Sequence, residues 1–316
     1  MADKIKVGIS ACLLGEKVRY DGGHKLDRFL RDTLGKFVEW VPVCPEVECG
    51  LTIPREAMRL VGEINNPRLL TQKTGIDHTQ KMSAWAQKKV KELAAMNLSG
   101  FVFKAKSPSS GMQNVKVYND KGFAVNKGVG VFARIFRQTF PFMPVEEEGR
   151  LHDPELRENF IEKLFVFQRW QELIANKKTS KGLIDFHSDH KLLLMAHSSK
   201  VLSALGKIVA NAKEYKKEKL FDAYMQTMLA GLSLLPTVNK NTNVLEHILG
   251  YFKQDLSSEE KQEAVEVIEN YHKGYVPLIV PIVLLQHYVR KYNKAYLKRQ
   301  YYLHPHPIEL ILRNHV

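Results

Sequence analysis

The chain has 316 residues, enough for two domains at roughly 100–200 residues each. Its 44% hydrophobic and 26% charged residues exclude a disordered or fibrous protein. The net charge of +13 divides into +8 over residues 1–150 (24 basic and 16 acidic side chains) and +5 over residues 151–316 (23 basic and 18 acidic). A surplus of this size makes nucleic acid the first partner to consider. The alternative is a surface charge that only keeps the protein soluble.

Short strands, each followed closely by a chemically distinctive segment, dominate the first part of the chain. Residues 4–10 predict a strand directly before Cys12, and residues 37–43 predict a second strand directly before Cys44. A third strand, Gly100–Lys104, leads into the serine-rich segment 106–111. Between them, apolar residues at helical spacing predict a helix over Thr79–Met96. This alternation predicts an α/β unit with a largely parallel sheet.

The cysteines and polar motifs of this part all follow predicted strands. In open α/β sheets, ligands bind outside the carboxyl ends of the strands. We therefore expect segments that are dozens of residues apart to converge on one crevice.

The second part of the chain is predicted to be helical. Residues 140–149 combine prolines with a run of glutamates, and we interpret them as a linker. Asp153-Pro154-Glu155 then provides an N-cap, a proline at the first helical position and an acidic first turn. The apolar run Val276–Leu285 contains two prolines and is too short to span about 30 Å of hydrocarbon. The start of the chain has no apolar core of a secretory signal. We predict an α/β domain over 1–150 and an all-α domain over 151–316, in a cytoplasmic protein without a membrane partner.

Three cysteines occur, Cys12, Cys44 and Cys49, all within the first 50 residues. Their small, odd number argues against a disulfide framework. Three thiolates suit an iron–sulfur cluster or zinc, and they would leave one iron of a cubane open, as a catalytic metal requires. Buried structural cysteines are an equally good interpretation of the spacing alone. His24 is a candidate fourth ligand for a zinc site.

Several separated motifs within residues 5–150 resemble the thiouracil desulfidase family. They are Ser10–Gly15 (SACLLG), Val18–Gly22 (VRYDG), Cys44-Pro45-Glu46, Gly50-Leu51 with Pro54-Arg55, and Phe103-Lys104 through Ser107-Pro108-Ser109. The remainder, from His190 through Asn243–His247 to Tyr302–Pro307, resembles a helical domain fused to that family in bacterial proteins. Such fusions are linked to removal of sulfur from 4-thiouridine in tRNA.

The resemblance implies a cofactor and two catalytic residues. Family members carry a 4Fe–4S cluster on three cysteines and need a glutamate and a serine, which match Glu46 and Ser107. Much of the family has a cysteine where this chain has Ser110, and here Cys49 supplies the third thiol instead. With Cys49 as the third thiol, the implied ligand set is Cys12, Cys44 and Cys49.

The residue chemistry is compatible with that reaction. Glu46, two residues after Cys44, can take a proton from water and return it, although a carboxylate capping the turn after Pro45 is the simpler interpretation without the resemblance. Ser107 would position the base. The candidate substrate-binding residues are Arg19, Asp21, Arg55, Ser109 and Ser110, with structural ion pairs as the alternative for the arginines.

The C-terminal part interleaves tyrosines with basic residues, from Tyr288 to Tyr302. Such a pattern suits phosphate contact and stacking on unpaired bases, and an amphipathic helix with inward-facing tyrosines is the alternative. We predict an iron–sulfur enzyme that hydrolytically desulfurates thiolated uracil, with 4-thiouridine in tRNA, or a thiolated nucleoside, as substrate. The rival is a nucleic-acid-binding module with a structural zinc on three cysteines and no catalysis.

Overall fold

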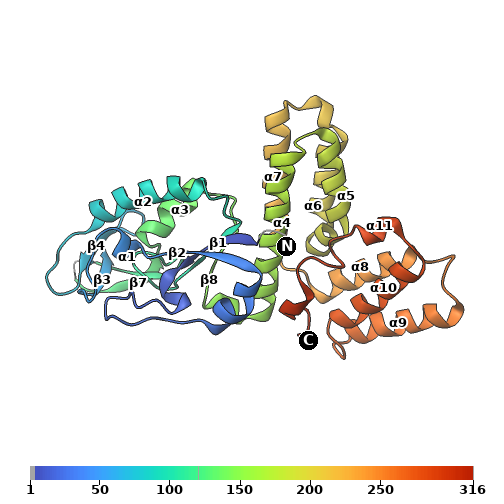
Figure 1. Ribbon diagram of the computed structural model, residues 1–316, viewed down its shortest axis with the longest axis horizontal. Helices are drawn as coiled ribbons and strands as arrows, with labels where there is room; N and C mark the ends of the chain where they lie inside the picture. Colours follow the sequence, from blue (N-terminus) through green and yellow to red (C-terminus); the bar gives the residue numbers. More distant parts are fainter. Residues whose placement is uncertain (1–3, 120, 316) are drawn as a thin grey trace. The chain divides into compact units, whose positions relative to one another are not determined.

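The structure is a computed structural model that describes residues 4–119 and 121–315. The chain divides into two compact units, Met1–Asp153 (unit 1) and Pro154–Val316 (unit 2). Unit 1 combines strands and helices, whereas the described elements of unit 2 are all helical (Figure 1). The predicted fold class is therefore confirmed.

Four parallel strands form sheet A of unit 1, in the order β2–β1–β5–β8. β1 (Ile5–Ser10) lies between β2 (Val38–Val43) and β5 (Gly100–Phe103). Because β1 is central, Val7 and Ile9 are fully buried, as expected for a parallel strand covered on both faces. These are the three strands predicted from the sequence, and their parallel pairing is confirmed.

The fourth strand of sheet A corrects one prediction. β8 (Val145–Glu147) pairs in parallel with β5, with Phe101 opposite Val145 and Phe103 opposite Glu147. The interpretation of residues 140–149 as a linker was therefore wrong. Glu146 and Glu147 tolerate burial because each has a partner: Arg150 Nε lies 2.9 Å from Glu146, and the Met112 amide donates to Glu147 over 2.7 Å.

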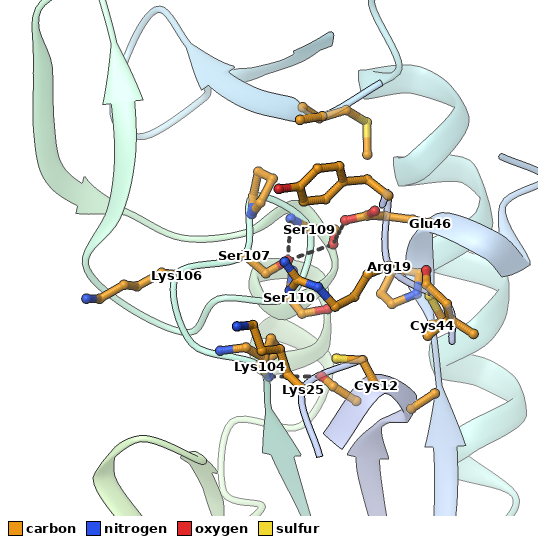
Figure 2. Close-up of a pocket in the computed structure, with 18 of the residues that line it drawn as sticks. Cys12, Arg19, Lys25, Cys44, Glu46, Lys104, Lys106, Ser107, Ser109 and Ser110 are labelled. Carbon is orange, nitrogen blue, oxygen red and sulfur yellow. Dashed lines mark hydrogen bonds between the residues drawn. The ribbon is translucent and has the colours of Figure 1, made fainter. Parts of the chain in front are cut away.

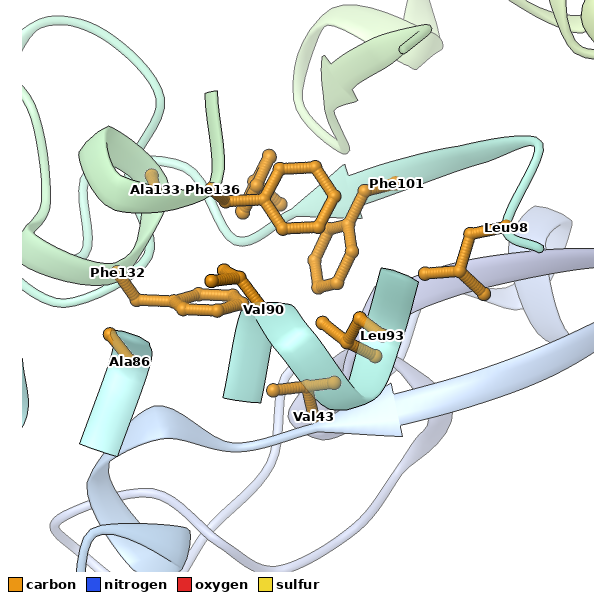
Figure 3. Close-up of a cluster of buried hydrophobic side chains, with 10 residues drawn as sticks. Val43, Ala86, Val90, Leu93, Leu98, Phe101, Phe132, Ala133 and Phe136 are labelled. Carbon is orange, nitrogen blue, oxygen red and sulfur yellow. The ribbon is translucent and has the colours of Figure 1, made fainter. Parts of the chain in front are cut away.

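Two helices pack against sheet A through an aromatic cluster (Figure 3). They are α2 (Thr79–Ala94), where the sequence predicted a helix, and α3 (Val131–Thr139). Phe101 of β5 stacks on Phe103 with ring centroids 4.3 Å apart, and its ring meets Phe136 of α3 at 4.9 Å. Gly8 of β1 makes room for this cluster, because a Cβ there would lie 2.2 Å from the Phe101 ring. Short helical turns complete this part of the unit: η1 (Ala11–Leu14), η2 (Phe29–Thr33), η3 (Leu34–Lys36) and α1 (Pro45–Glu48).

A second sheet, which the sequence did not predict, extends unit 1. Sheet B has the order β4–β3–β6–β7, with β3 (Met58–Val61) and β6 (Val115–Tyr118) parallel at its centre. The outer strands β4 (Arg68–Thr71) and β7 (Ala124–Gly128) run antiparallel to their neighbours. Its apolar face forms a cluster with residues of α2 and α3: Leu60, Leu69, Val117, Met82 and Val131.

Unit 2 begins with a helix that starts at Pro154, as the sequence predicted. Its longer helices are α4 (Pro154–Asn176), α5 (Ser180–His197), α6 (Ser199–Ala210), α7 (Lys217–Leu232), α8 (Val238–Gly250), α9 (Ser258–His272) and α10 (Ile279–Lys291). Short elements complete the chain: η4 (Arg150–His152), η5 (Ala212–Glu214), α11 (Ala295–Lys298) and η6 (Ile308–Leu310). None of the helices described here is long and apolar enough to cross a membrane.

The core of unit 2 combines aromatic packing with a buried ionic network. Trp170 of α4 stacks on Tyr224 of α7 with ring centroids 5.5 Å apart. Glu162, also on α4, lies 2.5 Å from His197 Nε2. Arg313 forms ion pairs with Glu162 at 3.3 Å and with Glu158 at 2.8 Å. These groups satisfy one another within the unit, as buried charges must.

Candidate active site

A cavity of about 420 Å³ lies where β1, β2 and β5 end. These carboxyl ends are where the sequence analysis predicted that the cysteine and serine motifs would converge. Each of the three strands leads into a segment that lines the cavity, and the turn around residues 18–25 and the start of β3 add further residues. The lining residues are Ser10–Cys12, Val18–Tyr20, Lys25, Val43–Glu46, Arg55, Ala57, Met58, Gln72 and Lys104–Ser110.

Two of the three thiols face this cavity (Figure 2). Cys12 lies in the turn η1, which Lys25 holds in place by donating its backbone amide to the Cys12 carbonyl oxygen over 2.9 Å. Burial raises the pKa of the Cys12 thiol to about 11, against the opposing effect of the Lys104 ammonium. Cys44 is the N-cap of α1, and burial raises the pKa of its thiol as well. Without a metal, both groups are therefore thiols at neutral pH.

The third thiol, Cys49, is not brought to the cavity. It follows α1 at its C-terminal end, with Sγ 3.2 Å from the carbonyl oxygen of Glu46, and it packs among apolar residues of sheet B. Cys44 and Cys49 cap opposite ends of the short helix α1, and only Cys44 lines the cavity. Ser110 does line the cavity, together with Cys12 and Cys44.

Glu46 is held in a defined orientation by two partners. Its Oε1 accepts a hydrogen bond from Ser109 Oγ at 2.9 Å. Its Oε2 forms an ion pair with Arg55, whose Nε donates over 2.8 Å and whose Nη2 also contacts the same oxygen. Arg55 is fixed in turn by donating to the Val18 carbonyl oxygen at 2.9 Å. The contacts from Arg55 and Ser109 together hold the Glu46 side chain in place in the cavity wall.

The serine loop acts as one hydrogen-bonded unit. Ser107 Oγ accepts the backbone amides of Ser109 and Ser110 at 3.3 and 3.1 Å, and it lies 3.0 Å from Ser109 Oγ. Because Ser109 spends its only hydroxyl hydrogen on the Glu46 carboxylate, Ser107 must be the donor to Ser109. Ser107 therefore shapes the loop and supports Ser109, which is the serine in direct contact with Glu46.

Several cations surround the thiols. Lys104, which follows β5, forms an ion pair with Glu148 and lies beside Cys12. Arg19 lines the cavity as predicted, but Asp21 does not: Asp21 accepts the Gly23 amide at 3.0 Å and is half exposed. The sequence reasoning missed Tyr20, Lys25 and Lys104. Lys104 could have been found, since it stands at the end of a predicted strand within a recognised motif.

The tyrosine-rich segment of unit 2 is packed more tightly than a base-stacking surface requires. Tyr288 and Tyr302 are buried, so the expectation that they stack on RNA bases was wrong for these two, and the inward-facing alternative applies. Lys291 pairs with Glu260 at 2.6 Å and Arg299 with Asp189 at 2.9 Å. Part of the basic surplus of this segment is thus neutralised inside the unit.

Comparisons with known proteins assign both parts of the chain. The 2-thiouracil desulfurase family matches residues 7–148, and a protein family of unknown function, DUF1722, matches residues 191–307. Uncharacterized protein YbgA of Escherichia coli (strain K12) is 31% identical over 153 residues, which cover 48% of this chain and 90% of YbgA. Uncharacterized protein YbbK of Bacillus subtilis (strain 168) is 29% identical over 137 residues, 41% of this chain and 88% of YbbK.

Among solved structures, the [4Fe-4S]-dependent thiouracil desulfidase TudS is 31% identical, with a TM-score of 0.40, and the match covers 48% of this chain and 95% of TudS. The family match over residues 7–148 contains all three strand ends that build the cavity. The first part of the chain, residues 7–148, belongs to the 2-thiouracil desulfurase family, and it is joined in the same polypeptide to a helical region that matches DUF1722.

Proposed function

We propose that this protein removes sulfur from 4-thiouridine in tRNA by hydrolysis, yielding uridine and hydrosulfide. The observation that carries the proposal is one cavity that combines two thiols, Cys12 and Cys44, with the oriented carboxylate of Glu46 in a 2-thiouracil desulfurase family member. The cavity volume of about 420 Å³ is in the range of small-molecule sites and suits a single nucleobase.

The residues can be assigned to the steps of such a reaction. Glu46 takes a proton from a water molecule, whose oxygen attacks the ring carbon that carries the sulfur. As the new carbon–oxygen double bond forms, the carbon–sulfur bond breaks, and the sulfur leaves with its bonding electron pair. One of the two water protons ends on the departing sulfide, which leaves as hydrosulfide, and the other is released from Glu46 to solvent; the ring keeps its own N–H and becomes uracil. No electron is transferred overall.

The other groups prepare Glu46 and the substrate for this step. Arg55 and Ser109 fix both oxygens of Glu46, so the carboxylate does not have to reorient before it takes the proton. Ser107 holds Ser109 in place. Arg19 and Lys104 provide positive charge in the cavity wall, where negative charge develops on the departing sulfur.

A 4Fe–4S cluster is the cofactor that we propose for this site. Thiolates are the ligands that hold such clusters. Cys12 and Cys44 line the cavity, whereas Cys49 lies at the other end of α1 among apolar residues of sheet B, so its side chain would have to turn towards the cavity to bind the group. We propose Cys12, Cys44 and Cys49 as the ligands. When bound, the cluster would supply an iron with an open position, a Lewis acid for a soft thiocarbonyl sulfur.

The test uses protein purified without oxygen. We expect a coloured protein with iron and sulfide in cluster stoichiometry that converts 4-thiouridine in tRNA into uridine and releases hydrosulfide. Turnover is followed by nucleoside analysis of the tRNA and by a sulfide assay. Colourless protein with stoichiometric zinc and no turnover would favour the rival interpretation, a structural zinc module.

Single substitutions test the ligand set by iron and sulfide content, independently of activity. Cys12→Ala, Cys44→Ala and Cys49→Ala should each lose most of the cluster, whereas Ser110→Ala should retain it. The reverse result for the last two, with Cys49→Ala loaded and Ser110→Ala empty, would assign the third position to the Ser110 hydroxyl, which faces the cavity.

A further inference from the structure

A second hollow adjoins the catalytic cavity on the side of sheet B. It has a volume of about 500 Å³ and contains residues of β3, β6 and β7. Four residues line both spaces: Met58, Gln72, Lys106 and Pro108. The two spaces therefore adjoin each other, and we call the second one the sheet B groove. Figure 2 shows Lys106 extending away from Ser107 and Glu46.

The charged side chains that line the sheet B groove are all positive. Arg59, Lys106 and Lys116 line it, and no carboxylate does so among the described residues. Arg59, Lys106 and Lys116 form no ion pair with any of the described residues. The remaining polar lining consists of amides, Gln72, Asn114 and Asn126, which can donate hydrogen bonds to an anion.

The Arg59 side chain is held in place by Tyr118. Its guanidinium carbon lies 5.2 Å from the centre of the Tyr118 ring, which holds the side chain against β6. Its Nε is buried, and it has no hydrogen-bond partner among the described residues. No ion pair of the Arg59 guanidinium is found among the described residues, so its outer N–H groups can donate to a phosphate oxygen in the groove.

We propose that the sheet B groove binds the backbone phosphate of an RNA nucleotide adjacent to the thiolated nucleotide. The inference rests on the proposed function, since it takes the base in the catalytic cavity to be part of a polynucleotide. A base in that cavity would direct its flanking backbone past the residues that line both spaces, towards Arg59 and Lys116. The substrate of this site is therefore an internal nucleotide of an RNA strand, and the phosphate contact distinguishes it from a free base.

The experiment compares two double variants of the full-length protein. Arg59→Gln with Lys116→Gln removes two groove cations, and neither residue lines the catalytic cavity. Lys88→Gln with Lys91→Gln on α2 removes the same charge from an exposed helix surface that lines neither space. The probe is a short, fluorescent single-stranded RNA with an internal 4-thiouridine, and its Kd is measured by anisotropy over a range of salt concentrations. Free thiouracil turnover is measured in parallel.

We expect the groove variant to bind RNA more weakly, with a slope of log Kd against log salt that is shallower by about 0.7, the value for one lost phosphate contact on a single strand. The α2 variant should behave like the parent, and free thiouracil turnover should be unchanged in both. Thiouridine monophosphate should bind all three proteins equally if the contacted phosphate belongs to the neighbouring nucleotide. A preference of the parent for the monophosphate would place the contacted phosphate on the thiolated nucleotide itself and overturn the assignment.

Equal RNA affinity and equal salt slopes in the two double variants would overturn the proposal, as would loss of free thiouracil turnover in the groove variant. Lys116→Glu alone, on the exposed side of β6, repeats the test if the Arg59 substitution disturbs folding. If the parent binds RNA with the predicted slopes but desulfurates no thiolated substrate, the proposed function fails while the groove remains supported.

Discussion

At the scale of single residues, Glu46 is the group whose chemistry depends most on its neighbours. Glu46→Gln keeps the size of the side chain and an acceptor for Ser109, but it cannot take up a proton. We expect kcat to fall by about 10²–10⁴, the usual contribution of one general acid–base group, with the iron content unchanged. Steady-state kinetics on free thiouracil measures the loss.

Glu48→Gln is the matched control for that substitution. Glu48 belongs to the same short helix, accepts the Cys44 amide at 2.8 Å and pairs with Lys89 at 2.9 Å, and it does not line the cavity. Its kcat should stay close to that of the parent. Near-normal turnover of Glu46→Gln at neutral pH would assign the proton transfer to another group.

The residues of the cavity were largely predictable, because the strand-end rule applies to each motif separately. Cys12, Cys44 and Ser107 all follow strands of one parallel sheet, and the sheet brings them together. The orientation of Cys49 was not predictable in this way. It depends on how far α1 rotates the chain between Cys44 and Cys49, which spacing in the sequence alone does not determine.

At the scale of elements, the beginning of α3 supports the serine loop. The amides of Val131 and Phe132 donate to the carbonyl oxygens of Pro108 and Ser109 at 3.2 and 2.9 Å. Gly130, the N-cap, lies so close that a Cβ would be 2.6 Å from the Ser109 carbonyl group. This close approach requires glycine, since backbone atoms cannot move aside as a flexible side chain can.

Gly130→Ala should therefore displace Ser109 and Ser110 and impair catalysis more than it impairs folding. We expect a loss of at least about tenfold in kcat/KM for free thiouracil, equivalent to about 1.4 kcal/mol. Gly149→Ala is the control, because a Cβ at Gly149 meets no atom within 4 Å. If the two variants have equal kcat/KM, the contact between α3 and the serine loop does not position the catalytic groups.

Elements with strong local patterns were predicted, and elements defined by distant partners were not. The helix from Thr79 has apolar residues at helical spacing, so its sequence is sufficient. The strands of sheet B have four or five residues each, and the sheet depends on the pairing of β3 with β6, in which Leu60 lies opposite the distant Val117. β8 contains two glutamates, residues that are rare in strands, and it is stable because Arg150 and the Met112 amide satisfy their carboxylates.

At the scale of the whole molecule, unit 2 buries histidines in their neutral form. Burial, reinforced by Arg313, lowers the pKa of His306 from its ordinary value of 6.5 to about 4. Burial and Arg169 also lower the pKa of His190. Below pH 6.5 the folded state then binds fewer protons than the unfolded state. The free energy of unfolding is therefore highest above that pH and decreases as the pH falls towards 4.

We expect the urea midpoint of unit 2 to fall between pH 6.5 and 4, with His306 contributing on the order of 3 kcal/mol. Tryptophan fluorescence of Trp170 and circular dichroism follow the transition. His306→Gln should reduce the pH dependence, whereas His287→Gln, at an exposed position, should leave it as in the parent. Equal pH dependence in the parent and in His306→Gln would show that His306 is not the responsible group.

The two compact units also predict a division of labour. A fragment of residues 1–153 contains the whole catalytic cavity and both core clusters of unit 1. We propose that unit 2 binds the rest of the tRNA, and we therefore expect the fragment to turn over free thiouracil and to lose most activity on thiolated tRNA. Activity of the fragment on tRNA equal to that of the full chain would place RNA binding in unit 1 alone.

Full-length variants of unit 2 provide a second measurement. Arg290→Gln with Lys298→Gln should raise KM for tRNA and leave free thiouracil turnover unchanged. Lys291 and Arg299 are unsuitable for this purpose, since their ion pairs with Glu260 and Asp189 stabilise the unit itself.

The run Glu146–Glu148 binds three separate segments. Glu146 pairs with Arg150, Glu147 accepts the amides of Met112 and Gln113, and Glu148 binds Lys104 and accepts the Ala105 amide. A recombination event that joined another domain upstream of residue 146 would remove all three clamps, and with them the support of the cavity wall around Lys104. A domain fused after this enzyme must therefore be joined after Glu148. Residues 146–148, which resemble a spacer in the sequence, cannot be removed without loss of the catalytic unit's support.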